Sequence, residues 1–184
     1  MVQQVKSSVP GRRLPDGTAV AAAATTVPAA RTAVAAGAVL IDLTGARLPV
    51  MTEVRDRYPG VLICAPAEWA DLVRDPATAR RTGAILVCAD AAAATAAEAG
   101  GIGRASILVE AAPARAAGLI AAGWRVLVDA GEVAGPHAAS AVAAVSAWLG
   151  AAAVRTRYVP AARRAVDMAD SIRGSGPTPG CEPL

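Results

Sequence analysis

The stretch AAGWRVLVDA, residues 121–130, joins the end of a helix-like segment to a short apolar run through one glycine. Glycine commonly ends a helix by adopting the left-handed conformation. The aliphatic run that follows Gly123 is typical of a strand buried on both faces. These ten residues therefore predict a helix end followed directly by a strand of a parallel sheet.

The same pattern recurs along the chain with a spacing of 20 to 27 residues, at Gly37, Gly60, Gly83, Gly103, Gly123 and Gly150. One strand, one helix and their turns need about this length, so the chain is predicted to consist of βα units. Seven strands are expected, near 17–24, 38–43, 61–65, 84–89, 105–110, 125–130 and 152–157. Helices are expected at 67–81, with Pro76 as a candidate break, and at 89–100, 112–123, 135–150 and 159–174.

Repeated βα units form either a parallel barrel or an open doubly wound sheet. The first predicted strand is not followed by the glycine fingerprint of a dinucleotide site. The segment GGIGRA, residues 100–105, precedes a strand, whereas a phosphate loop follows one. We therefore predict an α/β protein with a parallel TIM-type barrel. Such barrels typically need about 250 residues, so for this chain of 184 residues two forms stay open, a complete barrel and one reduced to about seven strands.

The ends of the chain differ in composition from its centre. Residues 1–16 are expected to be flexible, residues 17–174 to form the barrel domain, and the Pro- and Gly-rich residues 175–184 to be a disordered tail. The Arg12–Arg13 pair is followed within three residues by Pro15 and Asp16, which does not fit an export signal. A cytoplasmic protein is the expectation.

Composition excludes several function classes. The net charge is +3 and the arginines are scattered without interleaved aromatics, which argues against nucleic-acid binding. No apolar run reaches the ~20 residues of a membrane span. Three cysteines and one histidine, without a CxxC or Cys/His cluster, predict neither a disulfide framework nor a metal site. The 54% hydrophobic content includes no Phe, so the core must be built from Ala, Val, Leu and Ile.

Two segments carry a family resemblance. The segment GPHAASAVAAVSAWLGAAAVRTRYVPAARRAVDMADSIRG, residues 135–174, resembles the C-terminal part of dihydropteroate synthases. There an Ala-rich helix ends at GA, a strand has the approximate sequence VRVHDV, and a final helix ends in IRG. The segment AAGAVLIDLTG, residues 35–45, resembles the second-strand motif GADIIDVGGES of that family. The resemblance covers about 18–174.

The resemblance implies a dimeric TIM barrel of folate biosynthesis that joins a pterin pyrophosphate to p-aminobenzoate at the C-terminal ends of its strands. Asp42 matches the aspartate of IDVGGES, and Glu110 falls near the aspartate of LDPG. Arg155 matches the arginine of RVHD, and Arg157 replaces its histidine.

The chain also departs from the family pattern. AAAATTVPAA replaces the first-strand NVTPDSFSDGG, and the SVDT aspartate corresponds to about Ala65. The fourth-strand IND corresponds to VCAD, which places Cys88 where an amide should bind the pterin. The lysine of SRK has no counterpart in VDAGEVAG, residues 128–135. Since a site built from hydrogen bonds loses heavily when its partners vanish, the resemblance implies a degenerate, non-catalytic member, a pseudoenzyme.

Residue types at the strand ends predict an anion site. Arg155 and Arg157 alternate with Val154 and Thr156, so both should point to the barrel mouth, where two guanidiniums could bind a phosphate. The alternative is that they pair with acids such as Asp42 or Asp129.

The other candidate positions leave more than one role open. His137 follows Pro136 at a helix start and is either solvated or a phosphate contact. Asp42 and Glu110 could position a base or be structural. Asp129 and Glu132 lie near the mouth as well. The predicted substrate- or anion-binding residues are Arg155, Arg157, Asp42, Glu110 and His137, and no catalytic residue is assigned.

Two function classes remain. The first is a non-catalytic binding or partner subunit that keeps an anion site for phosphate, pyrophosphate or a pterin-like molecule and forms a homodimer or a heterodimer with a true synthase. The second is an enzyme, either an active dihydropteroate synthase or another enzyme acting on a phosphorylated small molecule. No cofactor is expected, and Mg²⁺ would be needed only if the pyrophosphate chemistry of the family survives.

Overall fold

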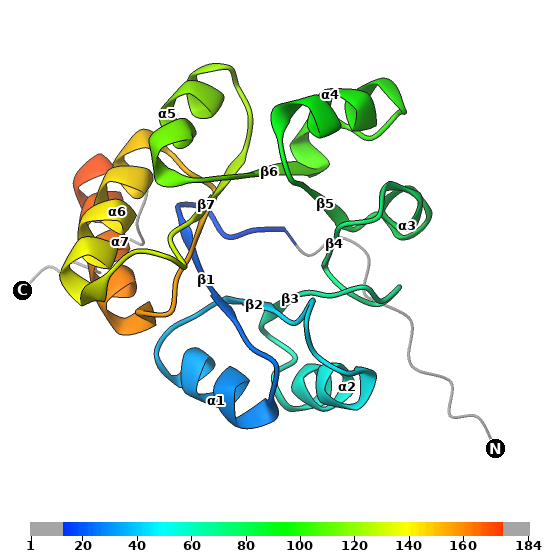
Figure 1. Cartoon of the computed structure of the whole chain (residues 1–184), viewed down its shortest axis with the longest axis horizontal. Helices are drawn as coiled ribbons and strands as arrows, with labels where there is room; N and C mark the ends of the chain where they lie inside the picture. Colours follow the sequence, from blue (N-terminus) through cyan, green and yellow to red (C-terminus); the bar gives the residue numbers. More distant parts are fainter. Residues whose placement is uncertain (1–12, 175–184) are drawn as a thin grey trace, which may run out of the picture.

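Eight parallel strands close into a barrel within residues 13–174, the part of the chain that this computed structural model describes (Figure 1). β8 pairs with β1 and closes the sheet. The strands are β1 (Ala19–Ala23), β2 (Leu40–Asp42), β3 (Leu62–Cys64), β4 (Leu72–Val73), β5 (Ile85–Cys88), β6 (Ile107–Ala111), β7 (Val126–Asp129) and β8 (Ala153–Arg155). The parallel TIM-type barrel predicted from the βα repeat is confirmed.

The helices surround this barrel (Figure 1). Within the described residues they are α1 (Val27–Ala35), α2 (Leu48–Arg57), α3 (Pro76–Thr82), α4 (Ala91–Ala99), α5 (Pro113–Ala121), α6 (Gly135–Leu149) and α7 (Val159–Arg173), with a 3₁₀ turn at Arg104–Ser106. Of the six glycines predicted to end helices, four adopt a positive φ: Gly37, Gly83, Gly123 and Gly150. Gly60 and Gly103 do not, so these two turns have another geometry.

The prediction of about seven strands is wrong, because the sequence pattern did not reveal β4. Leu72 pairs with Cys64 on one side and with Ile85 on the other, within the segment expected as a helix at 67–81. Within that segment, the helix α3 begins only at Pro76. A strand of two residues carries no periodicity, and the connection from β3 to β4 contains no helix that would mark a βα unit.

Inward and outward residues alternate along each strand. The inward set fills the lumen mostly with small and aliphatic side chains, including Ala19, Ala21, Leu40, Leu72 and Leu108. The outward set packs under the helices, which meet it largely through fully buried alanines. The aliphatic core expected from the absence of Phe is therefore confirmed, and small helix residues let the helices approach the barrel closely.

The two ends of the chain that were expected to be flexible or disordered lie largely outside the described residues. Residues 1–12 and 175–184 are not among the described residues. Of the remaining N-terminal segment, Leu14 is buried and packs against the lumen residues. Within residues 13–174, no helix has both the length and the apolar character needed to cross a membrane.

Shortening the Leu72 side chain tests the eighth strand. Leu72 is 0% exposed, and Leu→Ala substitutions in a core typically cost about 2–5 kcal/mol. We expect Leu72→Ala to lower the free energy of unfolding by an amount in that range, measured by urea denaturation. The control is Leu48→Ala on α2, where the side chain is 61% exposed and the expected change is within about 0.5 kcal/mol. Equal effects of the two substitutions would contradict the position of β4 in the barrel.

Candidate functional site

Charged side chains gather at the C-terminal ends of the strands, the barrel mouth. Each follows a buried lumen residue at a spacing of two, so it shares the inward face of its strand. The pairs are Leu40 and Asp42, Leu72 and Arg74, Leu108 and Glu110, Leu127 and Asp129, and Ala153 and Arg155. Barrel enzymes place their active sites at this end.

Arg155 is the centre of this group. Its Nη1 donates to Asp42 Oδ2 at 2.8 Å, and its Nη2 donates to Asp129 Oδ2 at 2.7 Å and also to Glu110 Oε1. Its Nε donates to the second oxygen of Asp129 at 3.3 Å. One guanidinium therefore binds carboxylates from β2, β6 and β7.

Arg74 completes the group beside it. Its Nη2 forms an ion pair of 2.7 Å with Glu110 Oε2 and lies 3.7 Å from Asp42 Oδ2. We call Asp42, Arg74, Glu110, Asp129 and Arg155 the mouth network. Two guanidiniums face three carboxylates, so the formal charge of the mouth network is −1.

Backbone and hydroxyl donors hold the carboxylates in place. Asp42 Oδ1 accepts from the backbone N–H of Thr44 at 3.0 Å and from the Thr44 hydroxyl. Asp129 Oδ1 accepts from the backbone N–H of Gly131 at 3.0 Å. The loops after β2 and β7 therefore hold these two acids in position independently of their bonds to Arg155.

The pKa shifts favour the charged forms. Burial opposes the charge of Arg155, but hydrogen bonds to Asp129 and the charges of the three acids raise its pKa above the ordinary value. Burial likewise raises the pKa of Asp129, yet the bonds from Arg155 and Gly131 outweigh it and lower that pKa. Burial, followed by the charge of Asp42, raises the pKa of Cys64 to about 11, so its thiol stays neutral.

The mouth network leaves almost no space at the barrel axis. The cavity lined by Asp42, Cys64, Arg74 and Arg155, together with lumen residues, has a volume of about 10 Å³. Two larger pockets lie on the rim. One of about 620 Å³ adjoins Arg74, and one of about 460 Å³ is lined mainly by apolar residues of β1, α1 and α7 together with Arg155 and Arg157.

Solved structures of similar shape cover most of the chain. Rv1207 of Mycobacterium tuberculosis shares 27% identity over 88% of this chain and 94% of its own, with a TM-score of 0.72. A dihydropteroate synthase of Coxiella burnetii in complex with pteroic acid shares 15% identity over 89% and 96%, with a TM-score of 0.72. That of Yersinia pestis shares 16% over 86% and 93%, with a TM-score of 0.69. No family model and no curated protein matches the chain.

The chain has the dihydropteroate synthase fold. The resemblance noted in the motifs of the second and last strands is thereby confirmed over most of the chain.

The dihydropteroate synthase fold corrects one motif correspondence. The fourth strand is β4, so the residue that follows it at the mouth is Arg74. Cys88 ends the fifth strand instead and is buried. Arg74 was missed because the alternation of Leu72 and Arg74 spans only three residues. Ala65 does follow the third strand, as the motif comparison placed it.

The structure brings together three of the five predicted site residues. Asp42, Glu110 and Arg155 meet in the mouth network, and Arg155 pairs with acids as in the alternative considered above. Arg157 lies beyond the end of β8, exposed, with its guanidinium 5.5 Å from the ring centroid of Tyr158. His137 is exposed in the first turn of α6 and takes no part in the mouth network.

This geometry weighs against an anion site shared by the two arginines. Arg155 is bound to three carboxylates, and an added anion would meet a net negative charge. An anion site at the mouth therefore stays a prediction that would depend on Arg157. Within residues 13–174, no group of three or more His, Cys, Asp or Glu side chains is placed to hold a metal ion.

Replacing each arginine separately tests this division of roles. Arg155→Met would leave three neighbouring carboxylates without their main partner, and breaking a buried ion pair typically costs about 3–5 kcal/mol. We expect a loss of unfolding free energy in this range, measured by urea denaturation at pH 7. Arg157→Met, the matched control, removes only an exposed cation and should cost less than about 1 kcal/mol. A small effect of Arg155→Met would show that the mouth network does not hold the strands together.

Proposed function

We propose that this chain is a non-catalytic protein with the dihydropteroate synthase fold, acting as a binding or partner subunit. The observation that carries the proposal is the set of four hydrogen bonds from Arg155 to Asp42, Glu110 and Asp129. Side chains that would have to bind a substrate at the mouth are bound to one another. Their charges are neutralised within the mouth network, to within one unit.

The available space supports the same proposal. Small-molecule sites usually have volumes of about 300–1,000 Å³, whereas the cavity at the barrel axis has about 10 Å³. A planar bicyclic ring such as a pterin could enter the axis only by separating Arg155 from its carboxylates. Breaking such pairs is costly because it leaves buried charges without partners.

The missing polar partners add a chemical reason. Ala65 follows the third strand, Arg74 follows the fourth, and the loop at 128–135 contains no lysine. Correct positioning of reactants can supply about 7–11 kcal/mol of a reaction barrier. A site that has lost these groups would lose much of that contribution for the synthase reaction.

The alternative is an enzyme, either an active synthase or another enzyme acting on a phosphorylated small molecule. The rim pocket of about 460 Å³ beside Arg157 is the feature that favours it. This pocket has room for a small molecule, and Arg157 is an exposed cation on its wall. Its walls are otherwise mostly alanine and other apolar groups, which offer few groups for acid–base work.

An apolar surface on α6 and α7 supports the role of a partner subunit. The exposed large hydrophobic residues include Val145, Trp148 and Leu149 on α6, and Met168 and Ile172 on α7. Residues 135–149 of α6 contain no Asp, Glu, Lys or Arg. The two helices lie side by side on the outside of the barrel (Figure 1). We define these five side chains as the α6–α7 surface and propose that a second copy of the chain covers it, as the family resemblance implies.

Catalysis is tested directly by a turnover assay. We expect no formation of dihydropteroate when the pure protein is mixed with pterin pyrophosphate, p-aminobenzoate and Mg²⁺, and no heat on titration with the pterin lacking phosphate. The reason is that the mouth network occupies the site. The Yersinia pestis synthase serves as the positive control. Turnover by this chain would overturn the non-catalytic role and favour the enzyme alternative.

Self-association is tested at Trp148, which is 58% exposed. A glutamate there would have to be buried unpaired at the interface, so Trp148→Glu is expected to convert a dimer into a monomer, as measured by sizing with light scattering at micromolar concentration. Leu48→Glu, at a side chain 61% exposed on α2, is the control and should leave the dimer intact. A monomeric wild-type chain would exclude the second copy, and a complex of that monomer with a true synthase would replace it as the partner.

A further inference from the structure

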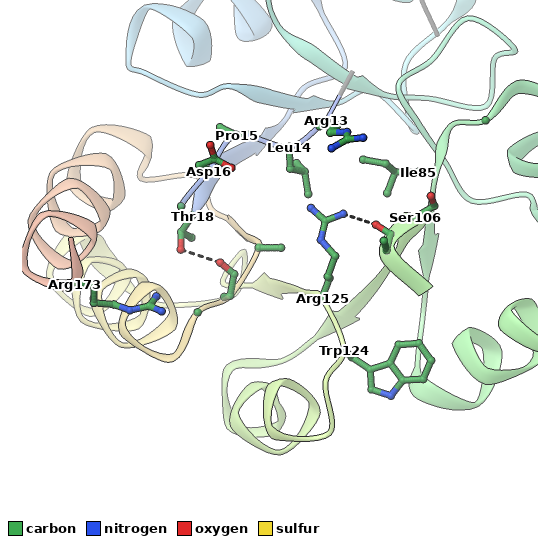
Figure 2. A pocket seen from close by; sticks show the side chains of 16 residues that line it. Arg13, Leu14, Pro15, Asp16, Thr18, Ile85, Ser106, Trp124, Arg125 and Arg173 are labelled. Atoms are coloured by element: carbon green, nitrogen blue, oxygen red, sulfur yellow. Dashed lines mark hydrogen bonds between the residues drawn. The ribbon is translucent and has the colours of Figure 1, made fainter. Parts of the chain in front are cut away.

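A further pocket lies at the opposite end of the barrel from the mouth network. Its volume is about 690 Å³, and its walls are mostly residues that come just before β1, β5, β6, β7 and β8, together with Ile85 at the start of β5 and Arg173 at the end of α7. Figure 2 shows these walls, with Leu14 and Arg125 facing each other across the space. The volume falls in the range of about 300–1,000 Å³ typical of small-molecule sites.

Arg125 supplies a cation that has no acidic partner among the described residues. Its Nη1 donates to the backbone oxygen of Ala105 at 2.6 Å, and it forms no ion pair with any residue between 13 and 174. The guanidinium points into the pocket toward Leu14 (Figure 2). Burial lowers its pKa. Arg155 in the mouth network is the opposite case, since three carboxylates surround it.

The rest of the wall also favours an anion. Among the described residues of the lining, Arg13, Arg125 and Arg173 stand against the single acidic residue Asp16, so their formal charge is +2. The Ser106 hydroxyl lies on the same wall and makes no hydrogen bond to the described residues. Leu14 and Ile85 provide apolar surface beside these donors.

We propose that this pocket binds a small molecule carrying an oxyanion, a phosphate or a carboxylate, with the oxyanion on Arg125 and Ser106 and the apolar part against Leu14 and Ile85. A guanidinium presents paired N–H donors that match the oxygens of both groups. The pocket lies apart from the mouth network, so this inference does not depend on whether the chain is catalytic.

Calorimetric titration with three probes tests the proposal on the full chain. Phenyl phosphate carries both an oxyanion and an apolar ring, benzoate replaces the phosphate by a carboxylate, and inorganic phosphate lacks the ring. We expect phenyl phosphate or benzoate to bind more tightly than inorganic phosphate. Whichever of the two binds more tightly identifies the oxyanion. Failure of all three probes to bind at millimolar concentration would overturn the proposal.

Substitutions place the bound probe. Arg125→Met should weaken binding by about tenfold to a hundredfold, because it removes charged hydrogen bonds to the oxyanion. Arg115→Met, at an exposed arginine of α5 outside the pocket, should leave the affinity unchanged. Unchanged affinity in Arg125→Met, or a loss in Arg157→Met at the mouth instead, would overturn the proposal.

Two further variants keep the test decisive if Arg125→Met does not fold. Asp16→Asn removes the one acidic residue among the described residues of the lining and should strengthen binding by about twofold or more, since like-charge repulsion from the wall disappears. Ser106→Ala should weaken binding because it removes the hydroxyl donor. Circular dichroism checks that each variant is folded. An Asp16→Asn variant that binds no more tightly, together with a Ser106→Ala variant that binds no more weakly, would refute this location.

Discussion

The ion pairs of Arg155 are the interaction on which the mouth of this barrel depends. Closure of the barrel brings Asp42, Glu110 and Asp129 from three strands to one rim, where three carboxylates would repel each other in partly dry surroundings. A guanidinium has enough N–H groups to bind all three, and Arg74 adds a second cation. β8 is thereby connected to β2, β6 and β7 across the mouth, in addition to the backbone pairing around the wall.

The pairing of these charged side chains with one another is the physical basis of the proposed non-catalytic role. In a barrel enzyme the groups at the strand ends are held ready for a substrate, and here they are held by one another. The dihydropteroate synthase fold is kept at 15–16% identity to the solved synthases from Coxiella burnetii and Yersinia pestis. Glycine turns and aliphatic strands suffice to keep a fold at such identity, whereas a site requires particular side chains.

Arginines at the two ends of the barrel show how environment decides the role of one residue type. Arg155 is surrounded by acids, so its donors are already used. Arg125 has one carbonyl partner and faces a pocket whose lining is positive overall. The proposed anion site therefore lies at the end where the strands begin, whereas the charged side chains at the end where the strands finish pair with one another.

The sequence by itself determined the barrel, most of its strands, the aliphatic core and the place of Asp42, Glu110 and Arg155 at the mouth. Local periodicity and glycine positions encode the strands, the core and the direction of Arg155, because each depends on neighbours a few residues away. The places of Asp42 and Glu110 followed from the family resemblance of their motifs. Only the tertiary structure revealed β4 and Arg74, since a strand of two residues has no measurable period. It alone decided that Arg155 pairs with acids while Arg157 does not, and that Arg125 stands without an acid among the described residues. Those outcomes depend on distances across the closed barrel, between residues as far apart in the chain as Asp42 and Arg155, and no local pattern carries that information.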